Sequence, residues 1–200
     1  MRRKVFDTLA SAGGAVVVVV LVVAGSLLMW GASFASSSVH DQLAQQEIFF
    51  PPASAFAQAK AGTEITPSMI PSVSQYAGQQ LLTGAQAEVY ANDFIAVHLS
   101  EMPYHGVYSQ ISAASRADPN NAQLKALVQT SFQGTTLRGL LLEAYAFGTF
   151  GAIAFWAGIA SFALAGVMLV LVLLGLWHAR KVPDAAELRI GSVPEVQLVS

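Results

Sequence analysis

The feature that most constrains this chain is a long stretch without charge near its C-terminus. After Glu143 no Asp, Glu, Lys or Arg occurs until Arg180. A bilayer's hydrocarbon core is about 30 Å thick, and roughly 20 helical residues cross it. Trp156 and Trp177 lie 21 residues apart, which is about 31 Å at a rise of 1.5 Å per residue, so their indoles match the two membrane interfaces. The stretch therefore predicts a transmembrane helix at 147–178, which Pro183 ends.

A second uncharged stretch lies near the N-terminus, from Thr8 to His40, behind the basic residues 2–4. A basic start is also typical of a signal peptide, whose apolar region has about 7–15 residues. Here the apolar run from 10 to 30 has about 20 residues, the length of a membrane span. Residues 33–35 would suit cleavage, so removal of this segment stays open as an alternative. We predict a retained transmembrane helix at 10–34.

The composition agrees with a membrane protein. Hydrophobic residues make up 54% of the 200 residues and charged residues 11%, against about a quarter charged in soluble domains. The chain has no cysteine, which excludes disulfides, thiolate metal sites and cysteine nucleophiles. Its net charge of −2 comes without a basic patch, so we expect no nucleic-acid partner.

The distribution of charge predicts the orientation. Basic residues flank the start of the first helix and the end of the second, so the positive-inside rule places residues 1–9 and 179–200 in the cytoplasm. The segment 35–146 carries eight acidic against four basic residues and is expected outside the cell. The predicted localisation is the plasma membrane, with both termini cytoplasmic and the central domain extracytoplasmic.

Helix signals predominate in the outer segment, and no stretch alternates as a strand would. The first helix is expected to continue from Asp41 to Gln46. Thr83 and Gln86 have the spacing of a capping box, and the helix behind them should end at Pro103. We expect a short helix at 107–114, a further helix start at 118–119 and a break at 134–136 before the last helix. The predicted fold class is an all-α membrane protein, with two transmembrane helices and a small helical extracytoplasmic domain between them.

Between the first helix and residue 83 the signals are less regular. Two consecutive prolines, 51 and 52, end the first helix. The aromatic residues Phe49 and Phe50 before them permit two interpretations, contact with a membrane surface or partner and filling of the small outer core. We favour the core. Residues 53–78 are expected to form a loop with short helical turns.

The only dense group of metal-ligating residue types is His98, Glu101 and His105. His98 and Glu101 are three apart and so share a helix face, and His105 follows the turn at Pro103. Two histidines and a carboxylate hold iron or zinc in many sites. The alternative is a helix end in water, because the spacing matches no established motif. We keep these three residues as a candidate metal site and expect no catalytic set and no bound cofactor.

Small residues recur at intervals of four in the second predicted span, as in Ala154 with Gly158 and Ser161 with Ala165, and Gly166 follows. Such faces allow helices to approach closely in lipid. They predict that the two spans pack on each other, that one face docks on another membrane protein, or both. No Asp, Glu, Lys or Arg lies in the middle of either span, which argues against a transporter or channel acting alone.

Several stretches of the chain resemble a family of uncharacterised two-span integral membrane proteins of actinobacteria. They are VHDQL (39–43), IFFPP (48–52), YAGQQL (76–81), FIAVHL (94–99), TLRGLL (136–141), AYAF (144–147) and LGLWH (174–178). Members are sometimes labelled aromatic ring-opening dioxygenases, enzymes that hold non-haem iron with two His and a Glu. Only His98, Glu101 and His105 would supply that set here. The helical pattern does not match a β-rich dioxygenase scaffold, and we expect the label not to apply.

Three functions follow as hypotheses. The first is a non-catalytic membrane protein, an accessory or scaffold component of a cell-envelope complex or of its own oligomer, with the bilayer and another membrane protein or itself as partners. The second is an extracytoplasmic metal-dependent enzyme or metal-binding domain that uses His98, Glu101 and His105. The third is a sensor whose loop 53–78 binds a ligand. The tail contains no recognisable output module, which argues against the third.

Overall fold

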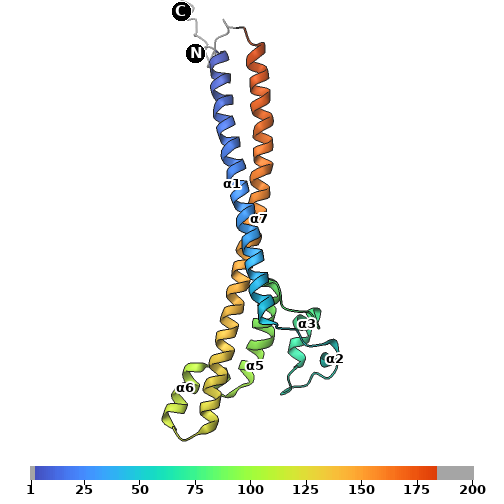
Figure 1. The fold of residues 1–200 in the computed structure, drawn as a ribbon, viewed down its shortest axis with the longest axis vertical. Coiled ribbons are helices and arrows are strands. Elements are labelled where there is room, and N and C mark those ends of the chain that lie inside the picture. Colours follow the sequence, from blue (N-terminus) through green and yellow to red (C-terminus); the bar gives the residue numbers. More distant parts are fainter. Residues whose placement is uncertain (1–2, 184–200) are drawn as a thin grey trace, which may run out of the picture. The chain divides into compact units, whose positions relative to one another are not determined.

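The computed structural model describes residues 3–183, which form helices joined by short connections (Figure 1). This range contains no β-strand, only an isolated bridge between Phe49 and Gln80, so the all-helical fold class is confirmed. Two helices, α1 (Arg3–Gln46) and α7 (Ala122–Lys181), are long and apolar enough to cross a membrane. Most of the predicted tail, residues 184–200, lies outside the described residues.

The chain divides into two compact units. The first contains the described residues 3–30 and 155–183, and the second contains Gly31–Ala154. The helices α1 and α7 each contribute residues to both units.

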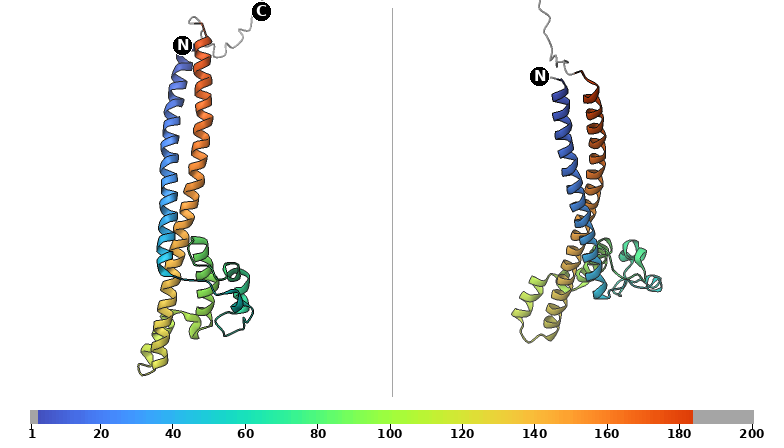
Figure 2. Two further views of the ribbon diagram at one scale, coloured as in Figure 1. Left: turned by 45° about the vertical axis from the view of Figure 1, so that its right-hand side comes forward. Right: turned by 45° about the horizontal axis from the view of Figure 1, so that its top comes forward.

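In the first unit α1 and α7 lie side by side and run in opposite directions (Figures 1 and 2). Glycines allow the close approach. A Cβ at Gly25 would lie 3.1 Å from the ring of Phe162, and one at Gly158 would lie 3.0 Å from the Sδ of Met29. The structure thus confirms that small residues let the two helices pack on each other. Gly166 is not part of this contact, since a Cβ there would have nothing within 4 Å.

The hydroxyl of Ser161 forms a hydrogen bond between the two helices within this apolar unit. The hydroxyl of Ser161 donates to the carbonyl of Leu21 at 2.8 Å. Interhelical hydrogen bonds in membrane proteins contribute about 0.6–1.7 kcal/mol. Ser161→Ala is therefore expected to lower the free energy of unfolding by about that amount, measured by SDS titration of the detergent-solubilised chain.

Ser26→Ala provides the control for this substitution. The hydroxyl of Ser26 donates to the carbonyl of Val22, four residues back on its own helix, at 2.8 Å. Such a bond inside a helix adds no stability between helices and can slightly weaken the helix. Equal losses from Ser161→Ala and Ser26→Ala would contradict a stabilising contact between α1 and α7.

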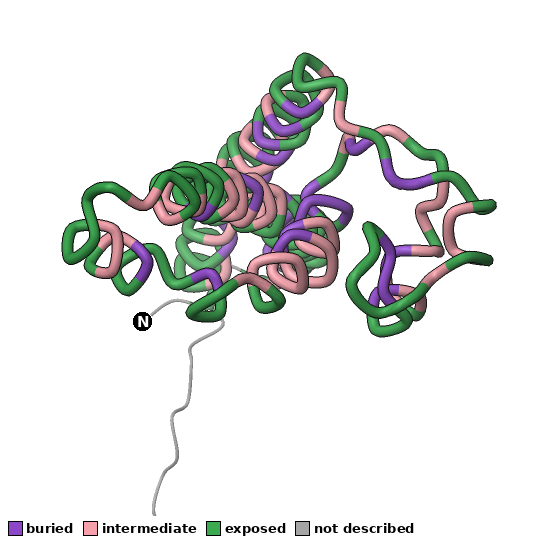
Figure 3. The backbone as a smooth tube through the Cα atoms, turned by 90° about the horizontal axis from the view of Figure 1, so that it is seen from below, coloured by how far each residue is buried: buried purple, intermediate pink, exposed green. Residues whose placement is uncertain are grey.

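Most of the surface of these two helices is exposed. Only 6% of the most apolar window of α1 and 11% of that of α7 is buried, and Figure 3 shows exposed positions (green) along the helices. A core helix of a soluble protein would be mostly buried. The exposed side chains include Trp30 and Trp156, which are 69% and 67% exposed. An exposed surface of apolar side chains is favourable in the hydrocarbon core of a membrane, and tryptophan is favourable at its interfaces.

The second unit holds the hydrophobic core. Between the long helices the chain forms short elements, which are α2 (Ala53–Phe56), η1 (Pro67–Met69), α3 (Ile70–Val73), η2 (Ser74–Tyr76), α4 (Gly84–Val89), the π-helix η3 (Tyr90–Ile95), α5 (Ala96–Glu101), η4 (Pro103–Gly106) and α6 (Tyr108–Ala117). Their buried residues pack around Phe50, Met69 and Leu81, together with Leu43 of α1 and Leu141 of α7. The core is therefore built from segments that lie far apart in the sequence.

Several local predictions are confirmed. The helix α1 continues to Gln46 and ends at Glu47, which has a positive φ of 50°. Thr83 and Gln86 form both hydrogen bonds of the capping box. Residues 53–78 contain short helical turns. Phe50 is 2% exposed and fills the core as predicted. The same prediction is wrong for Phe49, which is 57% exposed.

Two predictions about α7 are wrong. The helix does not start at Asp118-Pro119, because Asn121 takes the capping role and its Oδ1 accepts from the amide of Leu124 at 3.1 Å. The helix also has no break at 134–136 and is continuous from Ala122. A Cβ at Gly134 would lie 2.8 Å from the Cδ2 of Leu99, so this glycine allows Leu99 to pack closely and does not end a helix.

Candidate metal site

The three candidate ligands lie at the end of α5 and in the turn after it. His98 and Glu101 belong to α5, and His105 belongs to η4. The Nδ1 of His98 lies 2.8 Å from the carbonyl of Phe94, one turn earlier. The Nδ1 of His105 lies 3.4 Å from the carbonyl of Ser100. Among residues 3–183, no group of three or more His, Cys, Asp or Glu side chains is placed to hold a metal ion. The structure does not bring His98, Glu101 and His105 together as a ligand set.

The position of His105 is determined by an unusual turn. Tyr104, His105 and Gly106 are consecutive residues with positive φ angles of 58°, 53° and 68°. Pro103 opens this turn, as predicted, after α5 has ended. The carbonyl of Gly106 accepts a hydrogen bond of 2.6 Å from the hydroxyl of Ser131, which is fully buried on α7. This bond fixes the turn against α7 and thereby determines where His105 lies.

His98 is the last member of a row of aromatic rings in the second unit. The ring centroid of Phe50 lies 5.1 Å from that of Tyr76 and 5.3 Å from that of Tyr90. The row continues from Tyr90 to Phe94, whose centroids are 4.7 Å apart, and from Phe94 to His98, whose centroids are 4.6 Å apart. Edge-to-face and tilted pairs of this kind stabilise a core. His98 therefore has a packing role that the sequence did not predict.

The environment of Tyr90 keeps its phenol neutral. Burial, and secondarily the negative charge of Glu64, raise the pKa of Tyr90 above its ordinary value of 10.0. A neutral phenol at physiological pH is suited to packing in the aromatic row. It is not an activated acid or base.

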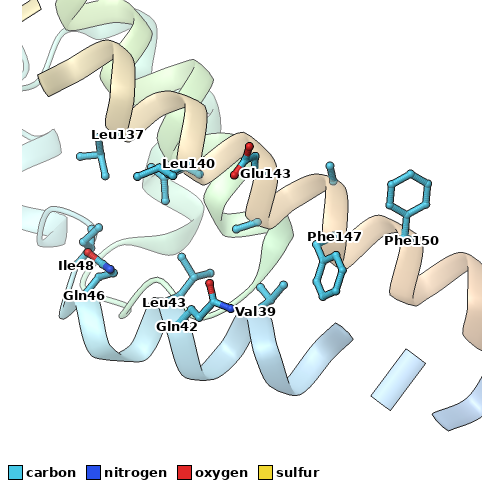
Figure 4. A pocket seen from close by; sticks show the side chains of 13 residues that line it. Val39, Gln42, Leu43, Gln46, Ile48, Leu137, Leu140, Glu143, Phe147 and Phe150 are labelled. Atoms are coloured by element: carbon cyan, nitrogen blue, oxygen red, sulfur yellow. The ribbon is translucent and has the colours of Figure 1, made fainter. Parts of the chain in front are cut away.

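The π-helix η3 carries a polar contact that the sequence analysis missed. The Nη2 of Arg138 on α7 donates to the Oδ1 of Asn92 at 2.9 Å. The Nε of the same side chain is buried without a hydrogen-bond partner among the described residues. Segments of π-helix often occur at functional sites, but neither Asn92 nor Arg138 lines the cavity of about 540 Å³ between the end of α1 and α7 (Figure 4) or that of about 240 Å³ at the other end of these helices. The signal for this contact was an arginine among the leucines of residues 136–142.

A second polar contact was missed at the end of the first unit. The Nε2 of His178 lies 3.9 Å from the Oδ2 of Asp7, an atom that is buried without a hydrogen-bond partner among the described residues. Together with Ser11 these residues line a cavity of about 240 Å³ between the ends of α1 and α7. In the sequence, the signal for this contact was Asp7, which directly precedes the uncharged stretch.

Comparison of the chain with family models, with curated proteins and with solved structures finds no match in any of the three. The resemblance to actinobacterial membrane proteins stays a prediction.

Proposed function

We propose that this chain is a non-catalytic integral membrane protein that crosses the plasma membrane twice. Both termini lie in the cytoplasm and the second unit lies outside. It serves as an accessory or scaffold subunit of a cell-envelope complex or of its own oligomer. The proposed orientation rests on the basic residues 2–4, 180 and 181 and on the acidic excess of the segment between the spans.

The observation that carries this proposal is the length of the uncharged helices. Positions 8–40 of α1 and 144–179 of α7 are uncharged, which corresponds to about 48 and 52 Å of helix. The hydrocarbon core is only about 30 Å thick. If Trp156 and Trp177 lie at the two interfaces, the part of the predicted span before Trp156 belongs to the excess length. That part carries exposed aromatic side chains, among them Phe147 and Phe150, which are 42% and 68% exposed. Large exposed apolar surfaces outside a membrane indicate contact with another protein.

The lack of charged residues in the two spans supports a binding role. Between Thr8 and Trp30, and between Phe155 and Trp177, the two helices contain no Asp, Glu, Lys or Arg. Ionisable groups inside the membrane mark most ion paths and proton relays. A pair of spans without them is suited to association and gives no support to transport.

The test is the state of the full-length tagged chain after gentle solubilisation from its native membrane. Native mass spectrometry should find a defined assembly, either several copies or a stoichiometric membrane-protein partner. Phe150→Ser should weaken that assembly, whereas Leu171→Ser, at a position 56% exposed within the span, should weaken it much less. A monomer without partner would contradict the proposal. About one iron or zinc ion per chain, lost in His98→Ala, would establish the metal alternative in its place.

A further inference from the structure

One end of the helix pair in the first unit carries a cluster of cations. Arg3 and Lys4 lie at the start of α1, and Arg180 and Lys181 lie at the end of α7. All four side chains are exposed. Figures 1 and 2 show the start of α1 beside the end of α7, so both helices contribute cations to one place, which we call the cationic end.

The charge of the cationic end is not balanced by acidic residues of the same unit. Asp7 is the only acidic residue in the ranges 3–30 and 155–183. Its side chain is 18% exposed, and its Oδ2 lies 3.9 Å from the Nε2 of His178 on the other helix. Asp7 is therefore directed between the helices and not toward the surface. The described part of this end presents positive charge, which attracts anions.

Exposed apolar side chains follow directly on the cations along each helix. On α7, Leu174 and Trp177 are 53% and 56% exposed, and with Lys181 they have the spacing of one helix face. The Nζ of Lys181 lies 3.7 Å from the ring centroid of Trp177, which holds the ammonium next to an indole of the kind found at membrane interfaces. On α1, Phe6 and Leu9 follow the first two cations and are 48% and 60% exposed.

This order of cation and apolar side chain distinguishes a phospholipid from a free anion. A free phosphate would use the cations alone and leave the apolar side chains in contact with any lipid. A phospholipid places its phosphate at the interface and its acyl chains against the apolar residues below. Clusters of basic residues on the cytoplasmic side of a span bind anionic lipids in this way.

We propose that the cationic end binds the phosphate head group of an anionic phospholipid of the cytoplasmic leaflet, with an acyl chain along Leu174 and Trp177. This inference rests on the proposed function, because it requires that α1 and α7 cross the membrane with this end in the cytoplasm. A zwitterionic lipid with the same acyl chains makes the same apolar contacts but brings no net charge. The proposal therefore predicts selection by the charge of the head group.

The test is native mass spectrometry of the full chain in detergent micelles, titrated with dioleoylphosphatidylglycerol or with dioleoylphosphatidylcholine. We expect the anionic lipid to bind at least about tenfold more tightly, because several cations act on its charge. Higher salt should reduce this preference, since salt screens exposed charges. Excess inorganic phosphate should not displace the lipid. Displacement by phosphate would overturn the lipid assignment in favour of a free anion.

Matched variants test the residues. Arg180→Gln/Lys181→Gln should weaken phosphatidylglycerol binding about 25-fold, at about fivefold for each basic residue, and leave phosphatidylcholine binding unchanged. Arg180→Lys/Lys181→Arg keeps both charges and should retain the binding. Lys125→Gln, at an exposed position of α7 in the second unit, should have no effect.

Two kinds of failure are distinguishable. Equal binding of the two lipids, or phosphatidylglycerol binding that Arg180→Gln/Lys181→Gln leaves unchanged, would overturn the anionic-lipid site while leaving the membrane spans supported. A chain that binds neither lipid and stays in solution without detergent would contradict the proposed function itself.

Discussion

Phe50→Ala is expected to lower the free energy of unfolding of the second unit by about 3–5 kcal/mol, the range for buried aromatic residues. The side chain is 2% exposed and packs against the rings of Tyr76 and Tyr90 at centroid distances of 5.1 and 5.3 Å. Its removal leaves a cavity between the loop 53–78 and the helix that starts at Gly84. Thermal unfolding followed by near-ultraviolet circular dichroism should show the loss as a decrease in Tm of about 10 °C or more.

The neighbouring residue provides the matched control. Phe49 has the same side chain but is 57% exposed, so Phe49→Ala should change the free energy of unfolding by less than about 0.5 kcal/mol. Both variants remove the same atoms from adjacent positions. Equal destabilisation would contradict the distinction between a core aromatic and a surface aromatic.

Gly106→Ala is expected to be the second most damaging substitution, at about 2–4 kcal/mol. Its φ of +68° lies in the left-handed region, which a side chain disfavours. In addition, a Cβ there would lie 2.5 Å from the carbonyl oxygen of Leu99 and 2.9 Å from its carbonyl carbon. Because backbone atoms cannot move aside as a flexible side chain can, the turn has to shift. That shift would disturb the hydrogen bond from Ser131.

Substitutions of two other glycines separate the two causes of this loss, the positive φ and the contact of a Cβ with the backbone of Leu99. Gly62 has a φ of +79° but open space around a Cβ, so Gly62→Ala should cost only the conformational term of about 1–2 kcal/mol. Gly139 lies in α7 with nothing within 4 Å of a Cβ, and Gly139→Ala should stabilise the helix by up to about 1 kcal/mol. The same thermal unfolding assay measures all three variants. A loss in Gly106→Ala no larger than that in Gly62→Ala would contradict the contact with Leu99.

The sequence predicts the helices well where the signal is local. The capping box at Thr83 and the proline pair after α1 act through neighbouring atoms, so the residues themselves contain the information. The two errors in α7 have a different origin. A glycine at position 134 is typical of a helix break, but here its small size allows close contact with Leu99, which lies 35 positions earlier. Asp118 and Asn121 are both good caps, and the sequence alone favoured the wrong one.

The sites were harder to predict than the fold. Proximity in sequence placed His98, Glu101 and His105 together, but the left-handed turn at 104–106 determines where His105 lies. His98 is instead held by its ring contact with Phe94. The cavity of about 540 Å³ between the end of α1 and α7 was not predicted at all, because its two walls come from helices separated by about 100 residues in the chain, and only packing brings them together. The apolar spacing at 137–144 was visible, but it signals a buried face equally well.

Cysteine accessibility in intact cells tests the central claim, two membrane spans with the second unit outside, most directly. The chain has no native cysteine, so a single Gln58→Cys reports the exposed surface of the second unit and a single Ser192→Cys reports the tail. We predict that a membrane-impermeant maleimide labels Gln58→Cys in intact cells and Ser192→Cys only after the cells are permeabilised, with both proteins in the membrane fraction. Labelling in the reverse pattern, or recovery of either protein in the soluble fraction, would contradict the account.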